Sequence, residues 1–102
     1  MIKEIVWTTG AAEDYLGACE HATSEIEFTL ALDTGLKLLR LFPNHGSQIE
    51  YSNRLRRILI GKKREFGLYY SVIGNRLIVS ALVNLRQNPS QIMDILRSRG
   101  VG

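Results

Sequence analysis

The stretch from Arg54 to Tyr70, RLRRILIGKKREFGLYY, concentrates side chains that can bind negative charge. It carries six basic residues against the single acid Glu65, and four more basic residues follow it. Guanidinium and ammonium groups bind phosphates and carboxylates, and they stabilise charge that develops on a phosphate during its cleavage. The candidate target-binding or anion-binding residues are therefore Arg54, Arg56, Arg57, Lys62, Lys63, Arg64, Arg76, Arg86, Arg97 and Arg99.

The charge is divided unevenly along the chain. Residues 1–50 contain three basic and eight acidic residues, whereas residues 51–102 contain ten basic and two acidic ones, so the halves carry −5 and +8. Arginine on an edge strand and lysine at a turn also serve solubility and block edge pairing. The cluster exceeds that need, and we interpret it as a surface for an anionic partner.

Residue patterns predict the elements that must position this cluster. Apolar spacing and turn residues give the order β-α-α-β-β-β-α. The expected strands are 2–7, 54–60, 67–73 and 76–84, the expected helices are 10–23, 25–42 and 91–99, and 43–53 is an expected loop. This is an α+β fold of one domain, residues 1–102, with a helical hairpin packed on one face of a small, mainly antiparallel sheet and the other face partly open.

The residue pattern also predicts which residues cap the helices and which residues of each helix face the core. Ser24 and Glu27 fit a capping box for the second helix, Gly74-Asn75 marks a tight hairpin, and Ser90 is the expected cap of the last helix. The predicted inward residues of the helices are Ala12, Tyr15, Leu16, Cys19 and Ala22 or Thr23 in the first, Phe28, Leu32, Leu36, Leu39 and Phe42 widened by Leu38 and Leu41 in the second, and Ile92, Ile95 and Leu96 in the last.

Composition narrows the class of protein. The chain has 102 residues, of which 45% are hydrophobic, so we expect one small core. No apolar run approaches the roughly 20 residues of a membrane span, and we identify no signal peptide. Cys19 is the single cysteine, which excludes an internal disulfide and favours the cytoplasm. His21 and His45 have no partner at ligand spacing, so we expect no metal site and no cofactor.

Short motifs distributed over nearly the whole chain resemble one known family. They are Trp7-Thr8 at the end of the first strand, A-x-x-D-Y-L at Ala11 to Leu16, F-P-x-x-G at Phe42 to Gly46, L-R-R at Leu55 to Arg57, Y-Y-x-V at Tyr69 to Val72, and V-x-L-R-Q-N-P at Val83 to Pro89. In order and spacing they resemble the RelE/ParE superfamily of type II toxin–antitoxin toxins, more on the ParE (plasmid stabilisation protein) side. The resemblance implies a small growth-arresting toxin that a cognate antitoxin wraps and neutralises.

The same resemblance is compatible with two different cellular targets. ParE-like members inhibit DNA gyrase, and RelE-like members cut mRNA at the ribosome. RNA cleavage needs a proton acceptor, a proton donor and stabilisation of the phosphorane charge. The candidates for a nuclease are Arg56, Arg57, Arg86 and Tyr70, although a tyrosine on a strand more often serves packing.

Three positions depart from the nuclease pattern. Gly67 stands where RelE-like nucleases carry arginine, the position of their C-terminal tyrosine falls near Ile92, and Asn84 replaces a histidine common in relatives. Arginine is a poor proton donor because its pKa stays above about 12. We therefore favour a ParE-like gyrase inhibitor that acts by binding. The alternatives are a RelE-like ribosome-dependent mRNA endonuclease (an mRNA interferase) and an inactive member that only binds antitoxin. The expected partners are an antitoxin, in a possible toxin–antitoxin hetero-oligomer, and either gyrase or the ribosome with its mRNA.

Overall fold

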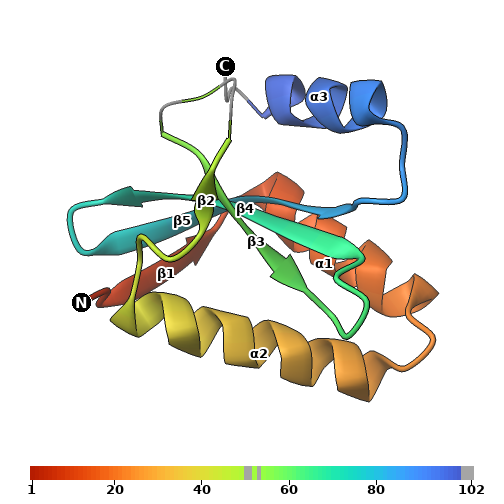
Figure 1. The fold of residues 1–102 in the computed structure, drawn as a ribbon, viewed down its shortest axis with the longest axis horizontal. Coiled ribbons are helices and arrows are strands. Elements are labelled where there is room, and N and C mark those ends of the chain that lie inside the picture. Colours follow the sequence, from red (N-terminus) through yellow and green to blue (C-terminus); the bar gives the residue numbers. More distant parts are fainter. Residues whose placement is uncertain (50–51, 53, 100–102) are drawn as a thin grey trace.

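The computed structural model, which describes residues 1–49, 52 and 54–99, has the predicted element order with one addition. Its elements are β1 (Glu4–Trp7), α1 (Thr9–His21), α2 (Glu25–Leu41), β2 (Ser47–Gln48), β3 (Arg56–Ile60), β4 (Phe66–Ile73), β5 (Arg76–Asn84) and α3 (Pro89–Ser98) (Figure 1). The added strand β2 lies in the segment predicted to be a loop, and its two residues pair with Arg56 and Arg57. Residues 50, 51 and 53 of that predicted loop lie outside the described residues.

The strands form one mixed sheet in the order β1-β5-β4-β3-β2. β1 runs parallel to β5, and the remaining neighbours are antiparallel. Gly74 and Asn75 join β4 to β5 in a two-residue turn, as predicted, with the positive φ of 63° at Gly74. A positive φ at the first turn residue suits glycine and matches the twist of the flanking strands. The fold is therefore α+β, and no described helix is long and apolar enough to cross a membrane.

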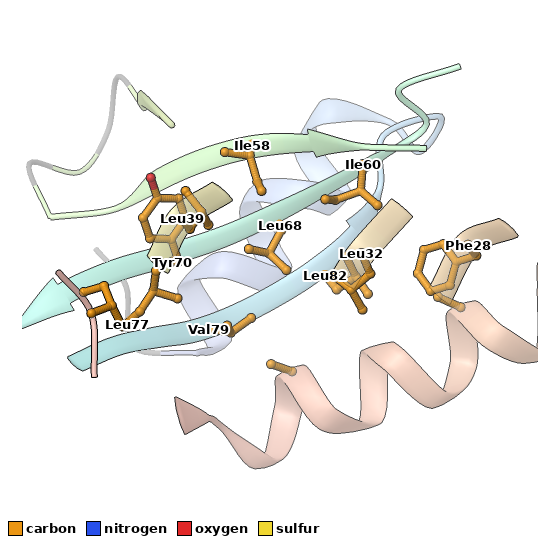
Figure 2. Packing of buried hydrophobic residues seen from close by; sticks show 13 residues of the cluster. Phe28, Leu32, Leu39, Ile58, Ile60, Leu68, Tyr70, Leu77, Val79 and Leu82 are labelled. Carbon is orange, nitrogen blue, oxygen red and sulfur yellow. The ribbon is translucent and has the colours of Figure 1, made fainter. Parts of the chain in front are cut away.

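The two faces of the sheet are both covered. Figure 1 shows α1 and α2 on one side and α3 on the other. The hairpin side holds the larger cluster, in which Phe28, Leu32 and Leu39 of α2 pack on Leu68 and Tyr70 of β4 (Figure 2). The sequence pattern predicts that the other face of the sheet is partly open. In the structure α3 covers it with a second, smaller cluster, made of Leu55, Tyr69, Ala81, Val83, Ile92 and Leu96.

Two predicted helix faces are wrong in part. In α1 the buried residues are Ala11 and Ala18, whereas Ala12 and Leu16, predicted to face inward, are exposed. The predicted Tyr15, Cys19 and Ala22 do pack, partly buried, against the main core cluster. The centre of the buried face is formed by Ala11 and Ala18, whose small side chains suit a close approach of the helix to the sheet.

In α2, the predicted inward residues Leu38, Leu41 and Phe42 are exposed. At 100° per residue, Leu41 lies about 200° from the buried Leu39 and points away from the sheet, whereas Leu38 lies about 100° from it, at the edge of the buried face and close to Ile58 and Ile60. Phe42 is the C-cap, and its backbone is no longer helical, with φ −130° and ψ 74°.

The helix caps explain where each helix begins. Thr8 accepts a hydrogen bond from the Ala11 amide, and Ser24 accepts one from the Glu27 amide, as its capping motif predicts. The predicted cap of α3 is wrong by two residues. Asn88, not Ser90, is the cap, because its carboxamide oxygen accepts from the Ser90 amide and Pro89 occupies the first helical turn.

Candidate functional site

The ten candidate basic residues occupy several separate places in the structure. Arg56 and Arg57 lie half-buried on β3, and the exposed Lys62, Lys63 and Arg64 form the turn between β3 and β4. The remaining five lie elsewhere: Arg54 before β3, Arg76 at the start of β5 beside Glu4, Arg86 after β5, Arg97 in α3 and Arg99 at its C-cap. The ten basic residues therefore do not form one continuous anion-binding surface.

Arg56 holds a loop rather than projecting freely. Its Nη1 donates to the Gly46 carbonyl at 2.8 Å and to the Asn44 carbonyl at 3.2 Å. Both acceptors belong to the connection between α2 and β2. The guanidinium therefore fixes the backbone of residues 43–46, and two of its donor positions are already occupied.

Tyr70 fixes the same loop from inside the core. Its hydroxyl donates to the Pro43 carbonyl at 2.7 Å and accepts from the Gly46 amide at 2.9 Å, and the residue is fully buried. Burial raises the pKa of this phenol because it disfavours the phenolate, against the opposing influence of the Gly46 hydrogen bond and the Arg56 charge. A raised pKa and two satisfied hydrogen bonds describe a structural tyrosine, in agreement with the packing interpretation of the sequence.

Gly46 is required by that contact. A Cβ atom placed there would lie 2.6 Å from the Tyr70 hydroxyl oxygen, which is too close for any real side chain. The F-P-x-x-G motif thus has a direct physical explanation, since its glycine lets the loop close over the tyrosine.

Arg57 lies on the opposite face of β3 from Arg56. A Cβ atom built at Gly67 would lie 3.1 Å from Arg57 Cδ, from Leu85 Cδ2 and from the Tyr69 ring. The aliphatic part of Arg57 therefore fills the space above Gly67. An arginine at position 67, as in RelE-like nucleases, would need these three neighbours to move.

Arg86 lies in the exposed segment that follows β5. Its amide donates to the Asn84 carboxamide oxygen at 2.9 Å, so Asn84 caps this turn through its side chain. The four nuclease candidates accordingly divide into two loop-holding residues, Arg56 and Tyr70, and two others, Arg57 and Arg86. The structure does not bring all four around one point.

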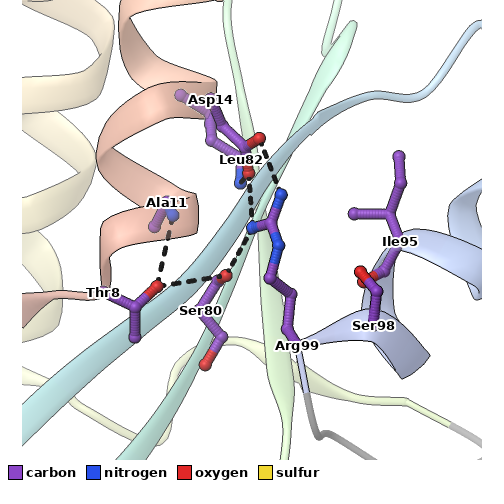
Figure 3. A network of polar contacts seen from close by, with 8 residues as sticks. All are labelled: Thr8, Ala11, Asp14, Ser80, Leu82, Ile95, Ser98 and Arg99. Atoms are coloured by element: carbon purple, nitrogen blue, oxygen red, sulfur yellow. Dashed lines mark hydrogen bonds and ion pairs between the residues drawn. The ribbon is translucent and has the colours of Figure 1, made fainter.

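Arg99 is occupied by an ion pair that the sequence analysis missed. Its Nη1 and Nη2 donate to the two carboxylate oxygens of Asp14 at 2.9 and 3.0 Å, which joins the end of α3 to α1 (Figure 3). The side chains are 23% and 19% exposed. The pair raises the pKa of the Arg99 guanidinium, chiefly through the hydrogen bonds to Asp14.

The same pair satisfies backbone groups of β5. β1 ends opposite Val79, and a bulge follows at Ser80, because Tyr70 pairs with Val79 and Tyr69 with Ala81. Beyond this point Arg99 donates to the Ser80 carbonyl at 3.0 Å, and Asp14 accepts from the Leu82 amide at 3.0 Å (Figure 3). A polar Ser80 within an apolar strand and the aspartate of the A-x-x-D-Y-L motif were the available signals in the sequence.

Gly10 makes room for this network. A Cβ atom there would lie 2.7 Å from the guanidinium carbon of Arg99. Of the ten basic candidates, Arg99 is therefore the one whose charge is most fully used inside the protein. Its place among the target-binding residues stays a prediction that the geometry does not favour.

An apolar groove lies between α1 and α2. Its volume is about 490 Å³, and its walls include Trp7, Tyr15, Leu16, Leu32 and Leu36. Trp7 and Tyr15 meet edge to face with ring centroids 5.9 Å apart. Leu16, which the sequence predicts to be buried, is 62% exposed here. Exposed leucines beside a groove are typical of a surface that another protein covers.

No candidate metal site is found in the described residues. They contain no group of three or more His, Cys, Asp or Glu side chains arranged to hold a metal ion. His21 and His45 are both exposed, and they lie in different parts of the fold.

Comparison with protein-family models finds no match for this chain, and comparison with curated proteins finds none either.

Proposed function

We propose that this protein is the toxin component of a type II toxin–antitoxin system, that it is ParE-like and inhibits DNA gyrase by binding, and that a cognate antitoxin neutralises it. The proposal rests on the ordered RelE/ParE-like motifs. The α+β fold, with a helical hairpin on one face of its sheet, is compatible with it. Several of those motifs have a clear role in the structure, including Asp14 in the α3 tether and Gly46 in the Tyr70 contact.

The state of Tyr70 is the observation that favours binding over cleavage. A nuclease needs a group that can give or take a proton at the scissile phosphate. The Tyr70 hydroxyl is buried, has a raised pKa and is hydrogen-bonded to Pro43 and Gly46. Arginines remain to stabilise charge, and a protein with charge stabilisation but no proton transfer is better suited to binding than to catalysis.

The decisive test is a gyrase supercoiling assay with purified protein. Inhibition is expected, and the variant Arg86→Ala/Arg97→Ala should weaken it by roughly tenfold if each exposed charge contributes about 0.5–1 kcal/mol at the interface. The matched control is Lys3→Ala/Arg40→Ala, which removes two exposed charges from the other half of the chain. Full gyrase activity at a large excess of folded protein would contradict the proposal.

A ribosome-dependent mRNA endonuclease is the second candidate. It is favoured by Arg57, which is half-buried on the α3 side of the sheet and for which the described residues provide no carboxylate partner. Arg57→Ala would then abolish mRNA cleavage in cells. Growth arrest that persists in this variant would instead support the gyrase proposal.

The antitoxin is expected to place an amphipathic segment over the helices or to displace α3. The groove between α1 and α2 and the exposed leucines of α2 provide apolar surface for such a segment. If acidic residues of the antitoxin meet the basic half of the chain, raising the salt concentration will slow association. An association rate that does not change with salt would exclude this electrostatic steering.

A further inference from the structure

The outer face of α2 carries a stripe of large apolar side chains. Ile26, Leu30 and Leu41 are each at least 58% exposed. At 100° per residue they lie within about 60° of one another and roughly opposite the buried Leu39. Figure 1 shows α2 along the outside of the fold. A helix that packs only on its own sheet carries polar residues on the opposite face, so this stripe indicates a further contact.

Two charged residues occupy the centre of this stripe. Asp33 and Lys37 lie between Leu30 and Leu41 on the same side of the helix, and their side chains pair at 3.0 Å while both stay more than half exposed. From Ile26 to Lys37 the spacing of the stripe alternates between four and three residues. This is the spacing of a seam between two packed helices. The stripe therefore has apolar ends and a centre that carries both charges.

This order of residues is complementary to a second copy of itself. A two-fold axis relates antiparallel helices so that each contact occurs twice, once from each copy. An axis at the midpoint between Asp33 and Lys37 places each of these residues opposite its counterpart in the other copy. The same axis brings Leu30 to within one residue of the position opposite Leu41. A parallel pair would instead place each charge beside an identical one, which is unfavourable.

From this pattern we infer that the outer face of α2 binds a second copy of this chain as an antiparallel helix pair, in a two-fold symmetric dimer. Asp33 and Lys37 form ion pairs across the axis, and Leu30 packs against Leu41 at both ends. The exposed Leu16 of α1 lines the same groove as Asp33, so the partner's helix also covers the mouth of that groove. The inference does not depend on the proposed toxin function. An antitoxin segment over these helices would compete with the second copy.

The area of this face sets the expected strength of the dimer. With its 17 residues α2 is about 25 Å long, and with α1 beside it at about 10 Å the contact face is roughly 20 Å wide. This corresponds to about 500 Å² for each copy and about 1,000 Å² in total, which is the lower limit for a specific interface. We therefore expect a weak dimer that forms as the concentration rises, and not a permanent one.

Sedimentation velocity of the full chain over a range of concentrations tests for the dimer. The average mass should rise from that of one copy toward that of two, and backbone amide NMR shifts should change with concentration in α1 and α2 but not in α3. Leu30→Glu should weaken the dimer about tenfold, because it buries a carboxylate opposite an apolar residue. Its own helix should persist, since glutamate is a good helix former.

Ile73→Glu is the matched control. Ile73 is also a large, exposed apolar residue, but it lies on the α3 face of the sheet, since the preceding Val72 packs on the hairpin side. The substitution adds the same charge away from α2, and this variant should dimerise like the wild type.

An exchange of charges tests the pairing across the axis. Asp33→Lys and Lys37→Asp should each dimerise several-fold more weakly, because two copies of either variant repel each other. An equimolar mixture of the two variants should recover the dimer, since opposite charges then face each other. Both variants lose the ion pair within α2, so a purely intrahelical role predicts no recovery.

Three results would overturn the inference. The first is a chain that stays monomeric at all concentrations up to the millimolar range, which would leave the stripe to a different partner. The second is equal weakening of the dimer by Leu30→Glu and Ile73→Glu, which would indicate non-specific association. The third is a mixture of the two charge variants that does not recover the dimer.

Discussion

The two sides of the sheet are held together by different means. On the hairpin side, α1 and α2 bury a continuous apolar cluster, and the polar groups of Tyr70 are satisfied within it. On the other side, α3 buries only Ile92 and Leu96, and its end is tied down by the Arg99–Asp14 pair. The difference indicates that the hairpin side sets the global stability, whereas α3 can open without unfolding the rest.

A pair of leucine substitutions should show the largest effect. Leu39 in α2 and Leu96 in α3 are both fully buried. Leu39→Ala should lower the free energy of unfolding by about 2–5 kcal/mol, as large-to-small changes in a core do. Leu96→Ala should lower it less and mainly accelerate hydrogen exchange in α3. Denaturant unfolding and hydrogen exchange measure the two quantities, and equal global losses would contradict the comparison.

Tyr70→Phe tests the buried hydroxyl and should have the next largest effect. It leaves the Pro43 carbonyl and the Gly46 amide without their partner, which should cost about 1–3 kcal/mol of unfolding free energy. The matched control is Tyr69→Phe, on the α3 side, where the described residues give the hydroxyl no hydrogen-bond partner and a change within about 0.5 kcal/mol is expected. A neutral Tyr70→Phe would show that the loop is held by Arg56 alone.

Asp14→Asn tests the tether of α3. An asparagine oxygen can still accept from the Leu82 amide, but the charge opposite Arg99 is lost, and about 1 kcal/mol of unfolding free energy should go with it. Hydrogen exchange should rise in α3 more than in α2. Asp33→Asn is the control, because its pair with Lys37 is exposed on the surface. Equal effects of the two substitutions would mean that the tether contributes no more than a surface ion pair.

At alkaline pH, ionisation of the tyrosine should lower the free energy of unfolding, an effect that is absent at neutral pH. Burial raises the pKa of Tyr70 above its ordinary value near 10, so the unfolded chain loses this proton at lower pH than the folded protein does. The stability is fully present below about pH 10 and should fall as the pH rises through 10 toward the folded pKa. Unfolding free energies measured across this range should decline less in Tyr70→Phe. An unchanged decline would assign the alkaline loss to other groups.

The sequence predicted the elements better than the contacts between them. Apolar spacing placed α2, β4 and β5 closely, because each is long and strongly patterned. It could not predict β2, whose two residues carry no periodicity, or the burial of Ala11 and Ala18 in α1, which depends on how closely this helix approaches the sheet.

The site was less predictable for a related reason. Residue type identified Arg56, Tyr70 and Arg99 as candidates but not whether each is used internally. That depends on contacts between residues far apart in the chain, such as Asp14 with Arg99 and Gly46 with Tyr70. Identical arginines in one short stretch, Arg56 and Arg57, lie on opposite faces of a strand and serve different purposes.

The central claim is that this protein acts by binding and not by cutting RNA, and one measurement tests it most directly. The protein is produced in cells without an antitoxin, and the 5′ ends of cellular mRNA are mapped within minutes. The account predicts growth arrest without new cuts inside translated codons. New in-frame cuts would contradict it, because they would require a proton-transfer group that the buried and hydrogen-bonded Tyr70 does not supply.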